Sequence, residues 1–181
     1  DIVLNSDTLA SIEGGAKLTV GEAVAAQSSK VTNSPTTYAV QDTASEVSGN
    51  LASLNNLSLS PNSIVVDSAS LSDYASLETD SLVTSINIVT SFAELNSSTG
   101  TVTASTLQNS SISKVGNVSI TNLSVSDVPS VTSFDGSYNA KVSLEDLPEN
   151  LLSFDTVYTQ SFLEAAENVA ITSGTTSAIS L

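Results

Sequence analysis

The chain has 181 residues, of which 40% are hydrophobic and 13% are charged, so it can form one domain or one short repeat array with a hydrophobic core. Nineteen acidic residues against four lysines give a formal net charge of −15, which disfavours binding to nucleic acid or to an anionic membrane surface. The chain has no His, Cys or Arg, and this excludes a histidine base, a thiolate nucleophile, a zinc–thiolate site and an arginine clamp for phosphate.

A five-residue signature recurs along the chain: Ser or Thr, an apolar residue, any residue, Asp or Glu, and an apolar residue. At the start of a helix, Ser or Thr accepts a hydrogen bond from a free backbone N–H, and an acid three residues later can bond back to the amide of that Ser or Thr. Each copy of the signature therefore predicts the capping box of a short helix. The predicted capping pairs are Thr19 and Glu22, Thr43 and Glu46, Ser70 and Asp73, Ser91 and Glu94, Ser124 and Asp127, Ser143 and Asp146, and Ser161 and Glu164.

Taken in chain order, a segment rich in β-branched and aromatic residues precedes most copies and predicts a strand before the helix. The expected strands are residues 38–40, 64–66, 86–89, 118–120 and 138–142. Apolar residues spaced by three and four after the signature predict helical stripes. The expected stripes are Val47, Leu51 and Leu54; Leu144, Leu147 and Leu151; and Phe162, Ala165, Ala166 and Val169.

Two further copies, at Thr8 and Thr103, keep the hydroxyl and the apolar positions but lack the acid. With them, the units begin near residues 8, 19, 43, 70, 91, 103, 124, 143 and 161. A strand–helix unit of this length cannot bury its apolar face alone, whereas stacked units can. We expect residues 1–181 to form a single array of about nine units, an α/β solenoid of strands and short helices with parallel strands. The alternative is a β-sandwich of the bacterial immunoglobulin-like type, which the short strands suit and the capping boxes disfavour.

One stretch resembles a known repeat. Residues 38–47 read Tyr-Ala-Val-Gln-Asp-Thr-Ala-Ser-Glu-Val and are followed by Asn50, Leu51 and Leu54. This stretch resembles units of very large secreted surface proteins of bacteria, cyanobacteria included, that are grouped with the RTX-like, haemolysin-type adhesins. The resemblance implies an extracellular adhesive or structural role and type I secretion. The chain lacks the Gly-Gly-x-Gly-x-Asp nonapeptide that binds calcium in those proteins, so calcium binding is not carried over.

The remaining candidate sites have simpler interpretations, and we expect neither a cofactor nor enzymatic activity. The acids of two stretches, Glu145-Asp146 with Glu149 and Asp73 with Glu78 and Asp80, match no EF-hand loop, and we expect them to cap helices or face solvent. A Ser–Lys dyad could be drawn from Lys114 with Ser111 or Ser113, but a surface lysine is the expected interpretation. The chain has no Gly-x-Ser-x-Gly elbow and no His to activate a serine.

These features together favour an extracellular or cell-surface structural protein, secreted from a bacterium, that self-associates into a filament, sheath or matrix. The segments Asp1–Leu4 and Thr176–Leu181 carry no evident polar cap, so we expect contacts between chains through the solenoid ends or the terminal strands. No nucleic-acid partner and no membrane insertion are expected. The alternative is a stalk or ligand-binding segment of a large adhesin that does not polymerise.

Overall fold

The computed structural model describes residues 17–28, 38–57, 60–109, 112–132, 139–147, 150 and 168–171. The chain divides into two compact units, Asp1–Ile88 with Ser113–Gly116, and Val89–Ile112 with Asn117–Leu181. In both units strands alternate with helices, and the strands are hydrogen-bonded in the order in which they occur in the chain. We call a strand together with the helix or helices that follow it a coil.

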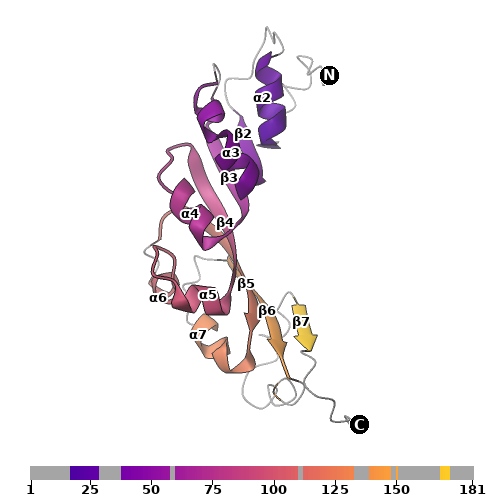
Figure 1. Ribbon diagram of the computed structural model, residues 1–181, viewed down its shortest axis with the longest axis vertical. Coiled ribbons are helices and arrows are strands. Elements are labelled where there is room, and N and C mark those ends of the chain that lie inside the picture. Colours follow the sequence, from indigo (N-terminus) through magenta and orange to yellow (C-terminus); the bar gives the residue numbers. More distant parts are fainter. Residues whose placement is uncertain are drawn as a thin grey trace. The chain divides into compact units, whose positions relative to one another are not determined.

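The first unit contains three complete coils (Figure 1). Its elements are β1 (Lys17–Leu18), α2 (Val20–Ser28), β2 (Ala39–Thr43), α3 (Ala44–Asn55), β3 (Ser63–Ala69), α4 (Leu71–Leu77) and the first part of β4 (Val83–Ser91). Each of the pairs β1–β2, β2–β3 and β3–β4 is parallel. Parallel neighbours require a crossover between them, and here the helix of each coil supplies it.

The second unit has shorter helices. Its elements after β4 are α5 (Phe92–Ser97), α6 (Ala104–Gln108), β5 (Val115–Leu123), the 3-10 helix η1 (Val125–Asp127), α7 (Val128–Thr132), β6 (Asn139–Asp146) and β7 (Asn168–Ile171). The pairs β5–β6 and β6–β7 are again parallel. No helix among the described residues has the length and apolar character needed to cross a membrane.

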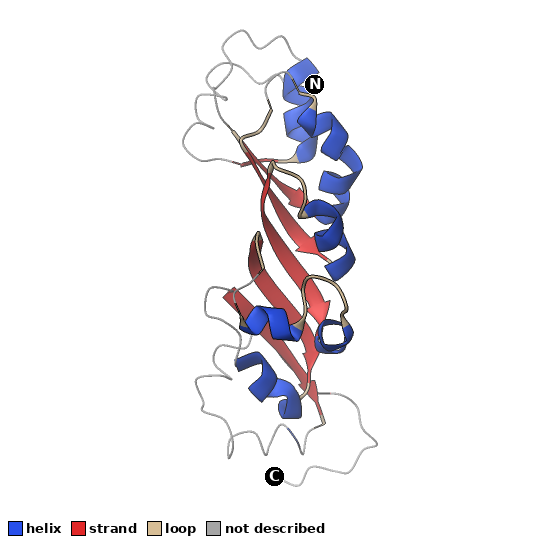
Figure 2. Ribbon diagram, turned by 90° about the vertical axis from the view of Figure 1, so that its left-hand side faces the viewer, coloured by secondary structure: helices blue, strands red, loops and turns tan. Residues whose placement is uncertain are grey.

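In the first unit the helices lie along one face of the strands, and the core fills the space between them (Figure 2). Alternate strand residues such as Val40, Ile64 and Ile86 are fully buried against this side. The helices contribute Leu54 and Tyr74, which are 0% and 1% exposed. No helix of the described residues covers the other face of β2, β3 and β4, and we call this the open face.

The expected α/β class is confirmed, and the β-sandwich alternative is wrong, because parallel strands joined by helices replace antiparallel hairpins. All five expected strands are present as β2 to β6, while β1 and β7 were not anticipated. Thr103 begins α6 with no strand between it and α5, so this copy does not begin a separate strand–helix unit. The copy at Thr8 and the residues Ser161 and Glu164 lie outside the described residues.

Two expected helical stripes need correction at the residues that the structure describes, while Leu151, Phe162, Ala165 and Ala166 lie outside the described residues. Ser143 lies inside β6, which continues to Asp146, so no helix begins at Leu144. Val169, expected on a helical stripe, lies in β7 and pairs with Leu144 of β6. In both places the β-sheet ladder continues where the local sequence pattern predicted a helical turn.

A repeated bulge ends two of the strands. The register of β3 shifts between Val66 and Ala69, and that of β5 shifts between Ile120 and Leu123. The extra residue has the left-handed backbone in both cases, with φ of 54° at Ser68 and at Asn122. The bulge brings the next residue, Ala69 or Leu123, into the core immediately before the residue that starts the helix.

Candidate functional site

Complete capping boxes start the helices α2, α4 and α5. At α4, Asp73 N donates to Ser70 Oγ at 3.1 Å, and Ser70 N donates to Asp73 Oδ2 at 2.9 Å. Ser91 and Glu94 make the same pair of bonds at α5. Thr19 and Glu22 do so at α2, with distances of 3.2 and 2.8 Å. The signature therefore acts as predicted at these three helix starts.

At α3 only half of the predicted box forms. Glu46 N donates to Thr43 Oγ1 at 3.4 Å, but the Thr43 amide donates to the carboxylate of Asp42 at 2.8 Å instead of to Glu46. Asp42 is adjacent to the cap residue, so its carboxylate replaces that of Glu46 as the acceptor of the Thr43 amide. Glu46 remains in the first turn of the helix, where the helix dipole favours negative charge.

The predicted caps of the second unit differ more from the pattern. Ser124 makes no bond to a backbone amide of η1, and its hydroxyl donates to Asp127 Oδ2 at 2.5 Å. Ser143 and Asp146 both lie in β6, and Asp146 Oδ1 accepts from Leu147 N and from Asn150 Nδ2, each at 2.8 Å. The copy that lacks an acid does form a box, because Thr106 Oγ1 accepts from Thr103 N at 2.8 Å while Thr106 N donates to Thr103 Oγ1 at 3.1 Å.

Two aspartates make a contact that the signature does not predict. Asp42 Oδ2 accepts from Val20 N at 3.0 Å, and Asp146 Oδ2 accepts from Val125 N at 2.9 Å. In each case the acid lies at the end of a strand, and the amide opens the helix of the preceding coil, 22 or 21 residues earlier. We call these contacts carboxylate bridges. In the stretch Gln-Asp-Thr, residues 41–43, the sequence places an acid directly before a cap residue. The amide that this acid binds lies in the preceding coil, too far along the chain for a local pattern to identify.

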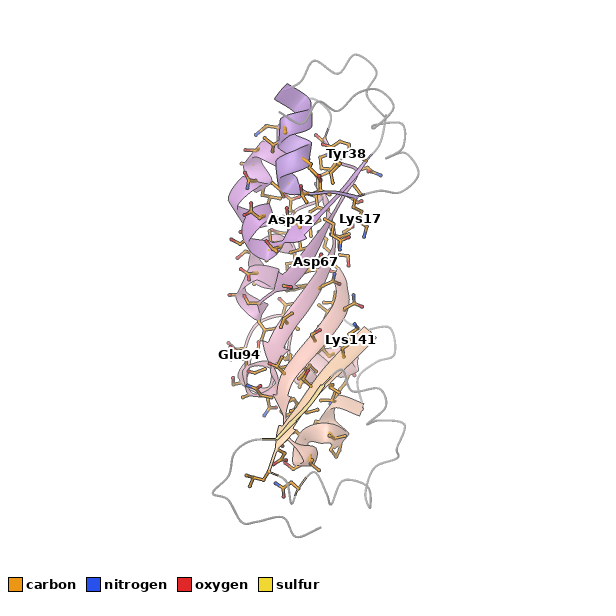
Figure 3. All side chains as sticks on the ribbon, turned by 90° about the vertical axis from the view of Figure 1, so that its right-hand side faces the viewer. Lys17, Tyr38, Asp42, Asp67, Glu94 and Lys141 are labelled. Carbon is orange, nitrogen blue, oxygen red and sulfur yellow. The ribbon has the colours of Figure 1, made fainter. Side chains whose placement is uncertain are left out.

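A row of polar side chains crosses the open face of the first unit. Asp67 is at its centre (Figure 3). Gln41 Nε2 donates to Asp67 Oδ2 at 2.7 Å, and Asn87 Nδ2 donates to Asp67 Oδ1 at 2.6 Å. Next to the row, a Cβ on Gly116 would lie 2.5 Å from Ser85 Oγ and 2.6 Å from Asn87 Oδ1, so a larger residue there would require these two side chains to move. The row joins three neighbouring strands through their side chains.

The Lys114 side chain is hydrogen-bonded to a backbone carbonyl. Its Nζ donates to the Asp80 carbonyl at 2.6 Å, and its backbone has a φ of 62°. The carbonyl of Ser113 accepts a hydrogen bond from Tyr74 Oη at 2.6 Å, while Ser111 lies outside the described residues. Asp80 also accepts from Asn55 Nδ2 at 2.8 Å. Asp80 thereby connects Asn55, the last residue of α3, to Lys114, which precedes β5.

The two stretches of acids considered for calcium make other contacts. Asp73 belongs to a capping box, Asp80 bonds to Asn55 and to Leu82 N, and Glu78 is the C-cap of α4. The Glu145 and Glu149 side chains lie outside the described residues. Within the described part of the chain, no group of three or more His, Cys, Asp or Glu is placed to hold a metal ion.

Hydrogen bonding lowers the pKa of two of these carboxyls. Donation from the Ser91 amide, then from the Ser91 and Thr90 hydroxyls, lowers the pKa of Glu94 (Figure 3). Burial pushes the pKa of Asp146 upward, but hydrogen bonds from Asn150, Val125 N and Leu147 N outweigh it, and the pKa is lowered. Burial raises the pKa of Tyr38. The carboxyls of Glu94 and Asp146 are therefore held in their charged, hydrogen-bond-accepting form.

Comparison of the chain with protein-family models, with curated proteins and with solved structures found no match. The candidate site is therefore defined by geometry: helix caps on one side of the sheet, carboxylate bridges between coils, and a polar row on the open face. Each of these groups bonds to another part of the same chain. This arrangement can order and fasten coils, and it offers no activated nucleophile among the described residues.

Proposed function

We propose that the chain is an extracellular structural protein of a bacterial surface, built as a strand–helix solenoid that self-associates into a filament, sheath or matrix. The observation that carries this proposal is that the strand pairs β1–β2, β2–β3, β3–β4, β5–β6 and β6–β7 are all parallel. The edge strand of a parallel ladder offers backbone N–H and C=O groups, and a coil of a second chain can continue such a ladder by the same hydrogen bonds.

The hydrogen-bonding side chains support a mechanical role. The caps fix the start of a helix within its own coil. The bridges and the polar row fix neighbouring coils to one another. Hydroxyl-rich, cysteine-free composition supports an extracellular setting, because the chain presents no thiol or thioether to oxidants. A head-to-tail contact that does not close a ring extends into a fibre, which is the assembly we propose.

Negative-stain microscopy and light scattering of the purified chain test the proposal. We expect rods whose length and mass grow with protein concentration in the micromolar range. A single species with the monomer mass of 18.5 kDa at all concentrations would contradict self-association. That result would favour instead a stalk or ligand-binding segment that acts within a larger adhesin.

A matched variant separates association through the ends from association through the open face. Val89, in the part of β4 that belongs to the second unit, is 41% exposed and is flanked by the buried Ile88 and Thr90, which places it on the face of β4 that points away from the core. Replacing Val89 with Gln would put a bulky polar group on that face without changing the charge. We expect the rods of Val89→Gln to match those of the wild type, whereas stacking of sheets face to face would be weakened by this variant.

A further inference from the structure

The carboxylate bridges share one geometry in two separate places. In the first unit Asp42 of β2 binds the first helical amide of α2, and in the second unit Asp146 of β6 binds the first helical amide of η1. In both, the acid belongs to the coil that follows along the chain and the amide to the coil that precedes it. Two independent occurrences indicate a device for joining coils.

The second oxygen of each carboxylate is fixed by its own chain. Asp42 Oδ1 accepts from Thr43 N and Asp146 Oδ1 accepts from Leu147 N, each at 2.8 Å. One oxygen thus orients the side chain while the other faces the neighbouring coil. Hydrogen bonds from an amide to a carboxylate are stronger than those between neutral groups, so a single bridge contributes appreciably where few other bonds exist.

Within the described residues, the strand ladder that joins the β1–α2 coil to its neighbour is short. The β1 ladder consists of the pairs Lys17 with Ala39 and Leu18 with Val40, whereas β2 pairs with β3 over five residues. Apolar residues of this coil, such as Val20 and Ala23, are also buried, with 2% and 1% of their surface exposed. A coil attached by so short a ladder opens more easily than its neighbours.

We infer that Asp42 fastens the β1–α2 coil to the β2–α3 coil, and that this coil opens as one piece when the carboxylate is removed. Figure 3 labels Asp42 of β2 and Lys17 of β1, and the short ladder connects these two strands. Opening of the coil exposes the edge of β2, residues Ala39–Thr43, to another strand. The inference concerns a single chain and holds whether or not the chains polymerise.

Hydrogen exchange of single amides in the Asp42→Ala variant tests this inference. The diagnostic amides are those of Glu22 and Ala23, because they bond to Thr19 inside their own coil and not to Asp42. If the coil opens as one piece, the amides of Val20, Glu22 and Ala23 exchange faster together, by at least about tenfold. Exchange at Ile64 and Tyr74, whose amides bond to Leu82 and Ser70, stays near the wild-type rate.

The control variant is Glu22→Ala, which removes a carboxylate from the same coil but leaves the bridge intact. It removes the acceptor of the Thr19 amide, so faster exchange is expected at Thr19 and not across the coil. Faster exchange in Asp42→Ala at Val20 alone would show that Asp42 only caps a helix, and no change at Val20 would show that the bridge is absent. Both results overturn the inference.

Should Asp42→Ala fail to fold, the wild-type chain supplies the test. Its exchange rates measured at increasing urea concentration give an opening free energy for each amide. Val20, Glu22 and Ala23 are expected to share one value, lower than those of Ile64 and Tyr74. Separate values for the three amides, or values equal to those of the rest of the first unit, would contradict opening of the coil as one piece.

Discussion

Ser68 and Asn122 occupy equivalent places, two residues before the helix start that follows β3 and β5. Both have a φ of 54°, in the left-handed region that side chains with a Cβ disfavour. Asn tolerates this region better than Ser, because its short amide can bond locally. Ser68 is exposed, so packing of its side chain does not account for its conformation, and the bulge in the backbone imposes it. The strain at this residue belongs to the join between strand and helix.

Replacing Ser68 with Gly should therefore raise the stability of the chain. Relief of left-handed strain, about 1 kcal/mol, outweighs the greater entropy of glycine in the unfolded chain, and a net gain of about 0.5 kcal/mol is expected in urea unfolding. Ser119→Gly is the control, because Ser119 lies in β5 without a positive φ and should lose about 0.5–1 kcal/mol. Losses of equal size in both variants would contradict strain at Ser68.

Among single residues, local caps were predictable from the sequence and contacts between coils were not. Ser70 and Asp73 are three residues apart, so their reciprocal bonds follow from helix geometry alone. Asp42 and Val20 are 22 residues apart, and their contact depends on how the first two coils stack. Asp146 matches the local signature yet serves as a bridge, because the ladder of β6 keeps its backbone extended.

At the scale of the element, the start of α5 depends on how the carboxylate of Glu94 is held. The box of α5 is the one in which three donors, Ser91 N, Ser91 Oγ and Thr90 Oγ1, converge on one oxygen of Glu94. Thr90 itself is only 4% exposed, and its carbonyl accepts from Thr121 Oγ1 at 3.3 Å. The helix start is thus tied to β4 and, through it, to β5.

This arrangement predicts a pH dependence for α5. The folded-state pKa of Glu94 is lowered below its unfolded value, so the unfolded chain binds more protons and stability from this group rises with pH. The contribution is present above the unfolded pKa of about 4.3 and is lost as the pH falls through the folded value. In Glu94→Gln the stability deficit relative to wild type should therefore shrink between about pH 6 and pH 3.

Urea unfolding of both proteins across this range measures the deficit, and taking the difference removes the effect of the other acids. Glu78→Gln is the control, because Glu78 is the C-cap of α4 and takes no part in a capping box. A deficit for Glu94→Gln that stays constant with pH would show that the charge of Glu94 does not stabilise the helix start.

Elements were predictable where both local pattern and burial agreed. The segments Ile64–Val66 and Ile86–Val89 alternate or run apolar, and both become strands whose isoleucines are buried. The residues Leu144–Asp146 belong to a capping signature, yet they extend β6, because pairing with β5 and β7 on both sides satisfies the backbone there. The two-residue strand β1 is too short for any periodicity to indicate.

At the scale of the whole molecule, charge opposes the association that we propose. Each chain carries a formal net charge of −15, so identical ends approach one another against electrostatic repulsion. Hydrogen bonds between strand edges and contacts between apolar surfaces are short-ranged, and salt weakens them far less than it weakens repulsion between exposed charges. Association through strands should therefore increase with ionic strength.

We predict that the assembled fraction, measured by light scattering at fixed protein concentration, rises from about 10 mM to about 500 mM NaCl, as the screening length falls from about 30 Å to about 4 Å. Calcium chloride at matched ionic strength is the control. Screening alone gives equal curves, whereas assembly that needs bound calcium requires the calcium salt at any ionic strength. Assembly that weakens as NaCl rises would mean that ion pairs hold the chains together. The backbone groups of a strand edge carry no net charge for salt to screen, so this result would contradict association by strand addition.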